Sequence, residues 1–285
     1  MNPMRTPGVL LTAVLLLCGT SCGVAARPAR PERVLFVGNS LTYVGNLPAV
    51  FASLAASNGR EVQADMIVKG GATLAQRAAD GSVARALREG RYPVLVLQER
   101  GGDLTCAFGP ESCTASREAI AQLARLAKSR NARVFLLGTY QSDPRASRRL
   151  VMAESGAASE AGVAYVEVSE TLQRLKTRTF GLRWFAPDGL HPGPLVTLLD
   201  AVQLYRGVFG GLPAPGALTV RAPIYGSTSG LTEALRGSAS APPRPDTPRG
   251  THYPLPVVGK LVAAVSGAAA DHASGQASPR GAVQL

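Results

Sequence analysis

The chain has 285 residues, with 30 lysines and arginines against 19 aspartates and glutamates and a formal net charge of +11. Setting aside a leader and a tail leaves about 190 residues, which suits one α/β domain with a single hydrophobic core. The arginines are scattered and are not interleaved with aromatic residues, so the charge does not indicate nucleic-acid binding. We interpret them as solvated helix faces with a weak preference for anionic envelope surfaces.

Residues 1–26 have the pattern of an export signal. One charge, Arg5, precedes the apolar run 9–17, and small residues follow as far as Ala26. This predicts cleavage after Ala26 and an exported protein, periplasmic or secreted. A lipoprotein anchored through Cys22 is the alternative, although the usual aliphatic residue three positions before the cysteine is missing. No apolar run reaches the roughly 20 residues that a membrane-spanning helix needs, so no transmembrane segment is expected.

Only two of the four cysteines remain after cleavage of the leader. Cys106 and Cys113 lie close together in a loop that contains glycine and proline. In an oxidising compartment such a pair predicts a local disulfide, and two free thiols are the alternative. A metal site is not expected, because none of the three histidines lies near these cysteines.

Short apolar, β-branched runs alternate along the chain with segments of helical period. The expected strands are 33–37, 62–68, 93–98, 133–140 and 163–168. The expected helices lie around 47–59, 74–88 (with a break at Gly81), 116–128, 145–160 and 195–208. This alternation predicts an α/β fold with a five-stranded parallel sheet covered by helices on both faces.

The composition divides the chain into three parts. A signal peptide at 1–26 precedes one α/β domain at 27–224, and a tail rich in Gly, Ser, Pro and Ala follows at 225–285. Such a composition predicts a largely disordered tail. Within it, 255–270 could form one short helix that docks on the domain.

Ser40 follows the first expected strand, in the small-residue turn Gly38-Asn39-Ser40-Leu41. The turn lies at the carboxyl edge of the predicted sheet, where open α/β sheets bind ligands. There the serine N–H and a helix dipole are available to a developing oxyanion. The alternative is a serine that only forms a turn or caps a helix.

A nucleophilic serine needs a base, and the choice of histidines is narrow. His252 and His272 both lie in the tail, which leaves His191. Asp188 stands three residues earlier in a turn rich in glycine and proline, so its carboxylate can reach one ring nitrogen while the other faces the serine. A capping aspartate beside a surface histidine is the alternative. Because both motifs occupy end loops of one sheet, we predict the triad Ser40, Asp188 and His191.

These two motifs resemble the first and last blocks of the SGNH (GDSL-type) hydrolases. Gly38-Asn39-Ser40-Leu41 is similar to the Gly-Asp-Ser-Leu block, and Asp188-Gly189-Leu190-His191 is similar to the closing Asp-x-x-His block. The resemblance spans roughly residues 33–212. It implies a flavodoxin-like three-layer α/β/α fold and ester hydrolysis through an acyl-enzyme, with no cofactor.

The resemblance also implies an oxyanion hole around Ser40. The second block is similar to Lys69-Gly70-Gly71-Ala72-Thr73, where the Gly71 N–H is the donor and Gly70 the neighbouring candidate. The third block normally carries an asparagine, which is absent here. A branch of the family with Gly-Asn-Ser and Leu-Gln-Glu instead implies Gln98, whose amide sits on a longer stem. A flexible turn at Gly71 and a strand-end bond of Gln98 to backbone are the alternatives.

We therefore expect an extracytoplasmic serine esterase that acts on short acyl esters, acetylated glycans among them. Its partner would be a small-molecule or glycan ester, and the oligomeric state is not set by the sequence. Two rivals stay open: a non-catalytic envelope or glycan-binding module on the same fold, and an acyltransferase with the same site residues. Tyr43, Trp184 and Phe185 are candidates to line the acyl or leaving-group pocket, with core packing as the alternative.

Overall fold

The computed structural model describes residues 32–178 and 182–275, with the side chains of the last helix described as far as residue 266. The signal peptide expected at 1–26, including Cys22, lies outside the described residues. So do residues 276–285 of the expected tail.

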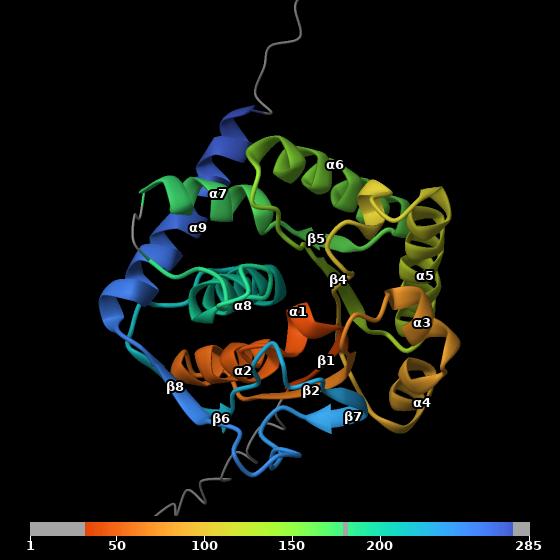
Figure 1. The fold of residues 1–285 in the computed structure, drawn as a ribbon, viewed down its shortest axis with the longest axis horizontal. Coiled ribbons are helices and arrows are strands. Elements are labelled where there is room, and N and C mark those ends of the chain that lie inside the picture. Colours follow the sequence, from red (N-terminus) through yellow and green to blue (C-terminus); the bar gives the residue numbers. More distant parts are fainter. Residues whose placement is uncertain (1–31, 179–181, 276–285) are drawn as a thin grey trace, which may run out of the picture. The chain divides into compact units, whose positions relative to one another are not determined.

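The central sheet of the described chain has six strands in the order β5-β4-β3-β1-β2-β7 (Figure 1). The strands are β1 (Glu32–Gly38), β2 (Val62–Lys69), β3 (Val94–Leu97), β4 (Arg133–Leu137), β5 (Ala164–Val166) and β7 (Thr232–Gly237). The first five are parallel, as predicted, whereas β7 pairs antiparallel with β2. The prediction of five strands is therefore corrected to six. β1 lies between β2 and β3, so the turns after these three strands meet at one edge of the sheet.

Helices cover both faces of the sheet (Figure 1). One face carries α2 (Leu47–Ser57), α7 (Ser169–Arg178), α8 (Pro194–Phe209) and α9 (Leu255–Gly275), and the other carries α3 (Leu74–Ala79), α4 (Ser82–Glu89), α5 (Pro110–Lys128) and α6 (Pro144–Ala161). In β1, Val34 and Phe36 join the first apolar cluster, while Leu35 and Val37 join the second. A strand buried on both faces has no polar side to show, which explains its continuous apolar run.

The expected helices are present, with changes at their ends. The segment predicted at 74–88 is divided into α3 and α4 at Gly81, as expected. α5 begins at Pro110, earlier than the predicted start at Ser116, because proline is preorganised for the first turn of a helix. α7 was not predicted from the sequence.

The prediction of a largely disordered tail is wrong for residues 225–254, whereas the helix expected within 255–270 is present as α9. β6 (Leu218–Pro223) pairs with β8 (Arg249–Tyr253), β7 joins the central sheet, and α9 packs Val258, Leu261 and Val265 into the first apolar cluster. The buried Asn46 side chain donates to the carbonyls of Pro223 (2.7 Å) and Ser238 (2.9 Å), which ties this segment to the start of α2. These long-range contacts leave no periodic signal, and the exposed edge strand β7 has no alternating apolar pattern.

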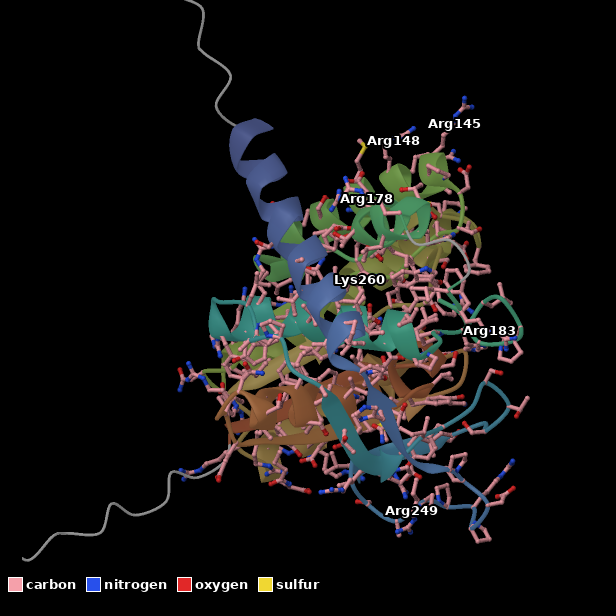
Figure 2. All side chains as sticks on the ribbon, turned by 90° about the vertical axis from the view of Figure 1, so that its left-hand side faces the viewer. Arg145, Arg148, Arg178, Arg183, Arg249 and Lys260 are labelled. Atoms are coloured by element: carbon pink, nitrogen blue, oxygen red, sulfur yellow. A yellow bond between two sulfur atoms is a disulfide. The ribbon has the colours of Figure 1, made fainter. Side chains whose placement is uncertain are left out.

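Positive side chains project from separate elements of one side of the molecule. Figure 2 shows Arg145 and Arg148 close together on α6, with Lys260 on α9 and Arg249 on β8 apart from them. All four side chains are exposed. Nowhere in residues 32–178 or 182–275 does a helix combine the length and apolar character of a membrane span.

Candidate active site

Ser40 is the first residue of the short helix α1 (Ser40–Tyr43), which begins directly after β1. The Asn39 side chain caps this helix by accepting the N–H of Leu41 at 3.0 Å, so Asn39 has a structural role. A Cβ at position 38 would collide with the Thr42 hydroxyl, so only glycine lets α1 turn back against the strand end. Ser40 is half-buried, and neither its N–H nor its hydroxyl is hydrogen-bonded to any described residue.

Asp188 and His191 lie on a hairpin between α7 and α8, which we call the Asp–His turn (residues 184–193). The Gly193 N–H donates to the Trp184 carbonyl and the Ala186 N–H donates to the His191 carbonyl, both at 2.9 Å. Gly189 has φ +71°, in the left-handed region that favours glycine. The backbone alone therefore closes this turn.

The Asp188 carboxylate organises the turn from inside. Its Oδ1 accepts the N–H groups of Leu190 and His191 at 3.0 Å each, and its Oδ2 lies 2.8 Å from His191 Nδ1. The backbone N–H of His191, then that of Leu190, holds the pKa of Asp188 well below its usual range, and the Ser227 hydroxyl adds to this. An ionised carboxylate only accepts hydrogen bonds, so His191 Nδ1 carries the proton and Nε2 is left as the basic nitrogen.

Residues 225–227 contact both the chain after α1 and the Asp–His turn. The Gly45 N–H donates to the Tyr225 carbonyl at 2.9 Å, and Ser227 lies close enough to Asp188 to help lower its pKa. This arrangement brings the element that carries Ser40 next to the turn that carries His191. Within the described residues no hydrogen bond joins the Ser40 hydroxyl to His191. Such catalytic bonds often tighten only when substrate is bound.

Gln98 follows β3 and reaches the nucleophile helix. Its N–H donates to the Val37 carbonyl at 3.0 Å, and its Oε1 accepts the Thr42 hydroxyl at 2.7 Å. This second bond orients the amide, because Oε1 is occupied and Nε2 is left as a donor. Gln98 is 1% exposed, and its Nε2 has no partner among the described residues.

The two glycines after β2 differ in what their N–H groups do. Gly70 donates to the Leu231 carbonyl of the C-terminal segment at 3.2 Å, so it is occupied. Gly71 is exposed, and its N–H makes no hydrogen bond within the described part of the chain. Gly71 is therefore the better of the two predicted candidates for an available donor.

Glu99 is a third residue at this edge, and we did not single it out from the sequence. Its carboxylate accepts the N–H of Leu74, the first residue of α3, at 3.1 and 3.2 Å, and that of Arg100 at 2.9 Å. Burial raises the pKa of Glu99 to about 7. The carboxylate thus ties the end of β3 to the helix that follows the Gly71 turn. Its position directly after Gln98 was the only signal in the sequence.

A cavity of about 690 Å³ adjoins the Asp–His turn, and we call it the Asp188 cavity. Its lining comprises Val44, Gly45, Ala186, Pro187, Asp188, Pro192, Gly193, Pro194, Ile224, Tyr225, Gly226, Ser227, Thr228, Thr251 and Tyr253. It touches Asp188 but neither Ser40 nor His191, so it adjoins one of the three residues and does not enclose the other two. Tyr43, Trp184 and Phe185 are not part of the lining. The first two are buried in the core and Phe185 packs on Tyr140.

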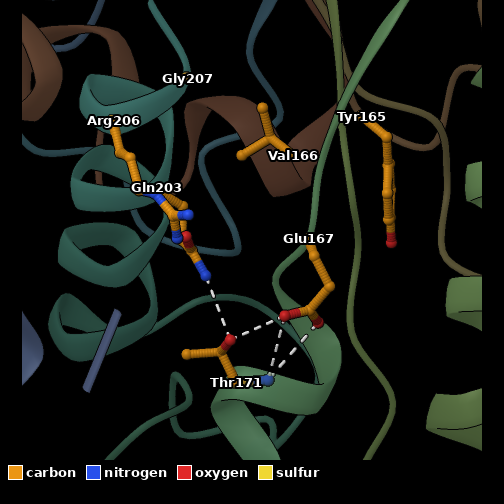
Figure 3. A pocket seen from close by; sticks show the side chains of 7 residues that line it. All are labelled: Tyr165, Val166, Glu167, Thr171, Gln203, Arg206 and Gly207. Atoms are coloured by element: carbon orange, nitrogen blue, oxygen red, sulfur yellow. Dashed lines mark hydrogen bonds between the residues drawn. The ribbon is translucent and has the colours of Figure 1, made fainter. Parts of the chain in front are cut away.

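A second cavity, of about 290 Å³, lies between β5, α7 and α8 (Figure 3). Its polar groups bond to one another: the Thr171 hydroxyl donates to Glu167 at 2.7 Å and accepts from Gln203 Nε2 at 3.2 Å. None of the predicted site residues lines it.

The two cysteines of the described chain are paired with each other. The predicted disulfide between Cys106 and Cys113 is confirmed, with an S–S distance of 2.07 Å. In the ranges that the structure describes, no three His, Cys, Asp or Glu side chains gather as a metal site would require.

Comparisons with known proteins support the fold. No family model and no curated protein matches the sequence. A solved structure of a DUF4886 family protein from Bacteroides uniformis is similar, with a TM-score of 0.52 and 14% identity over 64% of this chain and 84% of that one. A variant of Axe2, an acetyl xylan esterase from Geobacillus stearothermophilus, has a TM-score of 0.50 and 14% identity over 62% of this chain and 94% of that one. The expected fold class is confirmed: a mainly parallel α/β sheet between helical layers, as in the SGNH-type hydrolases.

Proposed function

We propose that this chain is an exported serine esterase in which Ser40 is the nucleophile, His191 the base and Asp188 the residue that orients the base. The observation that carries the proposal is the Gln98 amide. It is buried, it is held in one orientation by Thr42 beside the nucleophile helix, and its donor has no protein partner. Buried donors are normally paired, and we infer that the acceptor for this one is the oxyanion of the substrate.

In the acylation step, Ser40 Oγ attacks the ester carbonyl carbon as His191 Nε2 takes its proton. Asp188 accepts the Nδ1–H bond at 2.8 Å, which stabilises the imidazolium as it forms. The carbonyl oxygen becomes an oxyanion, and the donors proposed for it are the N–H groups of Ser40 and Gly71 together with Gln98 Nε2. The intermediate collapses when the imidazolium returns its proton to the leaving alcohol oxygen.

The second half of the reaction uses the same groups. Water enters in place of the alcohol, His191 Nε2 takes one of its protons, and the resulting hydroxide attacks the acyl carbon. This second intermediate collapses when the imidazolium returns that proton to Ser40 Oγ, which releases the carboxylic acid and restores the Ser40 hydroxyl. No cofactor takes part in either half.

The substrates that we propose are esters with short acyl groups. The acetyl xylan esterase named among the structural relatives makes acetylated polysaccharides the first glycans to screen. The disulfide and the export-signal pattern of residues 1–26 support a site of action outside the cytoplasm.

The test is hydrolysis of p-nitrophenyl acetate by the purified chain and by its Ser40→Ala variant. The proposal predicts that the variant folds normally by circular dichroism and loses at least about 10⁴-fold in kcat/KM. Turnover near the wild-type rate in the variant would overturn the mechanism. Acyl product on an added sugar in preference to free acid would identify an acyltransferase instead.

A further inference from the structure

We propose that the Asp188 cavity binds the leaving alcohol of the ester, and that this alcohol is uncharged and at least as large as one ring. This inference rests on the proposed function and names a substrate class for the same site.

The position of the cavity assigns it to the alcohol. His191 delivers its proton to the leaving oxygen, so the alcohol must depart on the side of the Asp–His turn. The cavity is lined by that turn, through Pro187, Asp188 and Pro192, and by Val44, which directly follows α1. The proposed oxyanion donors Gly71 and Gln98 lie instead at the ends of β2 and β3, where the carbonyl oxygen would point.

The charge of the lining residues disfavours an alcohol that carries a negative charge. Asp188 is the single charged side chain among the residues that form the cavity, which include no lysine or arginine. Its carboxylate stays ionised because backbone N–H groups hold its pKa low. A carboxylate or phosphate on the alcohol would therefore meet a like charge with no cation to pair with it.

The remaining lining suits a group with an apolar face. Prolines, Ala186, Val44 and Ile224 supply apolar surface, while the hydroxyls of Ser227, Thr228 and Thr251 can bond to alcohol substituents. A volume of about 690 Å³ falls in the range of small-molecule sites, and a methyl or ethyl group would leave it nearly empty.

One wall of the cavity comes from the C-terminal segment, through Ile224–Thr228, Thr251 and Tyr253. This wall is held in place: Tyr225 accepts the Gly45 N–H, and Asn46 bonds to Pro223 and Ser238 on either side of it. The segment that the sequence marks as a tail thus selects the substrate and also contacts Asp188 through Ser227.

The experiment compares acetate esters that differ only in the alcohol. The wild type is expected to prefer benzyl acetate over ethyl acetate in kcat/KM, and to hydrolyse 4-(acetoxymethyl)benzoate at least about tenfold more slowly than benzyl acetate. Thr228→Trp, which fills the cavity from an exposed position, should lower the benzyl-to-ethyl ratio at least about tenfold. Thr228→Lys should reduce the difference in kcat/KM between benzyl acetate and the carboxylated ester, because the lysine supplies a positive charge that can pair with the carboxylate. Thr114→Trp, on an exposed site of α5, is the matched control. It should keep the wild-type kcat/KM ratio of benzyl to ethyl acetate and that of benzyl acetate to the carboxylated ester.

Binding of benzyl alcohol to the Ser40→Ala protein provides a readout without catalysis. Saturation-transfer NMR should detect the alcohol on Ser40→Ala and lose it on Ser40→Ala/Thr228→Trp, which supports the site even if no ester is hydrolysed. If neither Thr228 variant changes its ratio and the double variant still binds the alcohol, the assignment of the cavity is overturned. Esterase activity that depends on Ser40 would then still support the proposed function.

Discussion

The two halves of the candidate site are built in different ways. The Asp–His turn is local: the carboxylate, the imidazole and the backbone groups that fix them lie within ten residues, and Asp188 is saturated with donors. The proposed oxyanion side is assembled from the ends of β1, β2 and β3, and its candidate donors at Ser40, Gly71 and Gln98 have no partner among the described residues.

The difference indicates which part of the site needs a ligand to satisfy its polar groups. A half that satisfies its own polar groups can hold a base in one tautomer before any substrate arrives. A half that leaves donors unpaired is preorganised for charge that only the reaction supplies. Substitutions in the first half should therefore affect the proton transfer, and those in the second should affect the stability of the oxyanion.

The largest effect is expected from Asp188→Asn. The asparagine oxygen can still accept the N–H groups of Leu190 and His191, so the turn should persist. Its amide, however, favours the wrong imidazole tautomer and cannot stabilise the imidazolium, so kcat should fall about 10⁴-fold. Steady-state kinetics with p-nitrophenyl acetate measure this, and a loss below tenfold would remove Asp188 from the mechanism.

A smaller loss is expected from Gln98→Leu. Removing one oxyanion donor should lower kcat about 10²- to 10³-fold with little change in KM. Thr42→Val is the matched control, because it breaks the same 2.7 Å hydrogen bond but keeps the Gln98 donor. Because the Thr42 bond also orients the amide, Thr42→Val should lose part of the activity, but less than Gln98→Leu; equal losses would show that the Gln98 donor contributes nothing beyond that bond.

The smallest effect concerns stability. Burial raises the pKa values of Glu99 and of Glu154, a buried residue of α6, from 4.5 to about 7, so the folded state binds these protons more tightly than the unfolded chain. This contribution is complete below about pH 4.5 and is lost as pH rises to about 7, so the free energy of unfolding should fall across that window. Glu99→Gln should remove up to about 3 kcal/mol of this fall, as measured by urea unfolding at several pH values.

The control for that measurement is Glu118→Gln, at an exposed position on α5. It should keep the wild-type dependence of unfolding on pH. If the free energy of unfolding of Glu99→Gln depends on pH in the same way as that of Glu118→Gln, the Glu99 carboxylate does not titrate in this window.

Much of the Asp–His turn could be predicted from the sequence. Little of the proposed oxyanion side could be predicted in the same way. The contact between Asp188 and His191 follows from three-residue spacing in a turn, and the parallel strands follow from apolar runs that are buried on both faces. The bond between Thr42 and Gln98 joins residues far apart in the chain, as does the contact of Ser227 with Asp188, so no spacing marks either one. The order of residues 225–254 escaped prediction for the same reason, because pairing with distant strands and the bond from Asn46 to Ser238 fix it, whereas a helix within 255–270 was expected.

The central claim is that Ser40 is a nucleophile activated by His191. Intact-protein mass spectrometry after treatment with a p-nitrophenyl phosphonate ester tests it most directly. We predict one covalent adduct on the folded wild type, located on Ser40 by peptide mapping, with none on Ser40→Ala and far slower labelling of His191→Ala. A folded wild type that takes up no adduct, or one labelled at another residue, would contradict it.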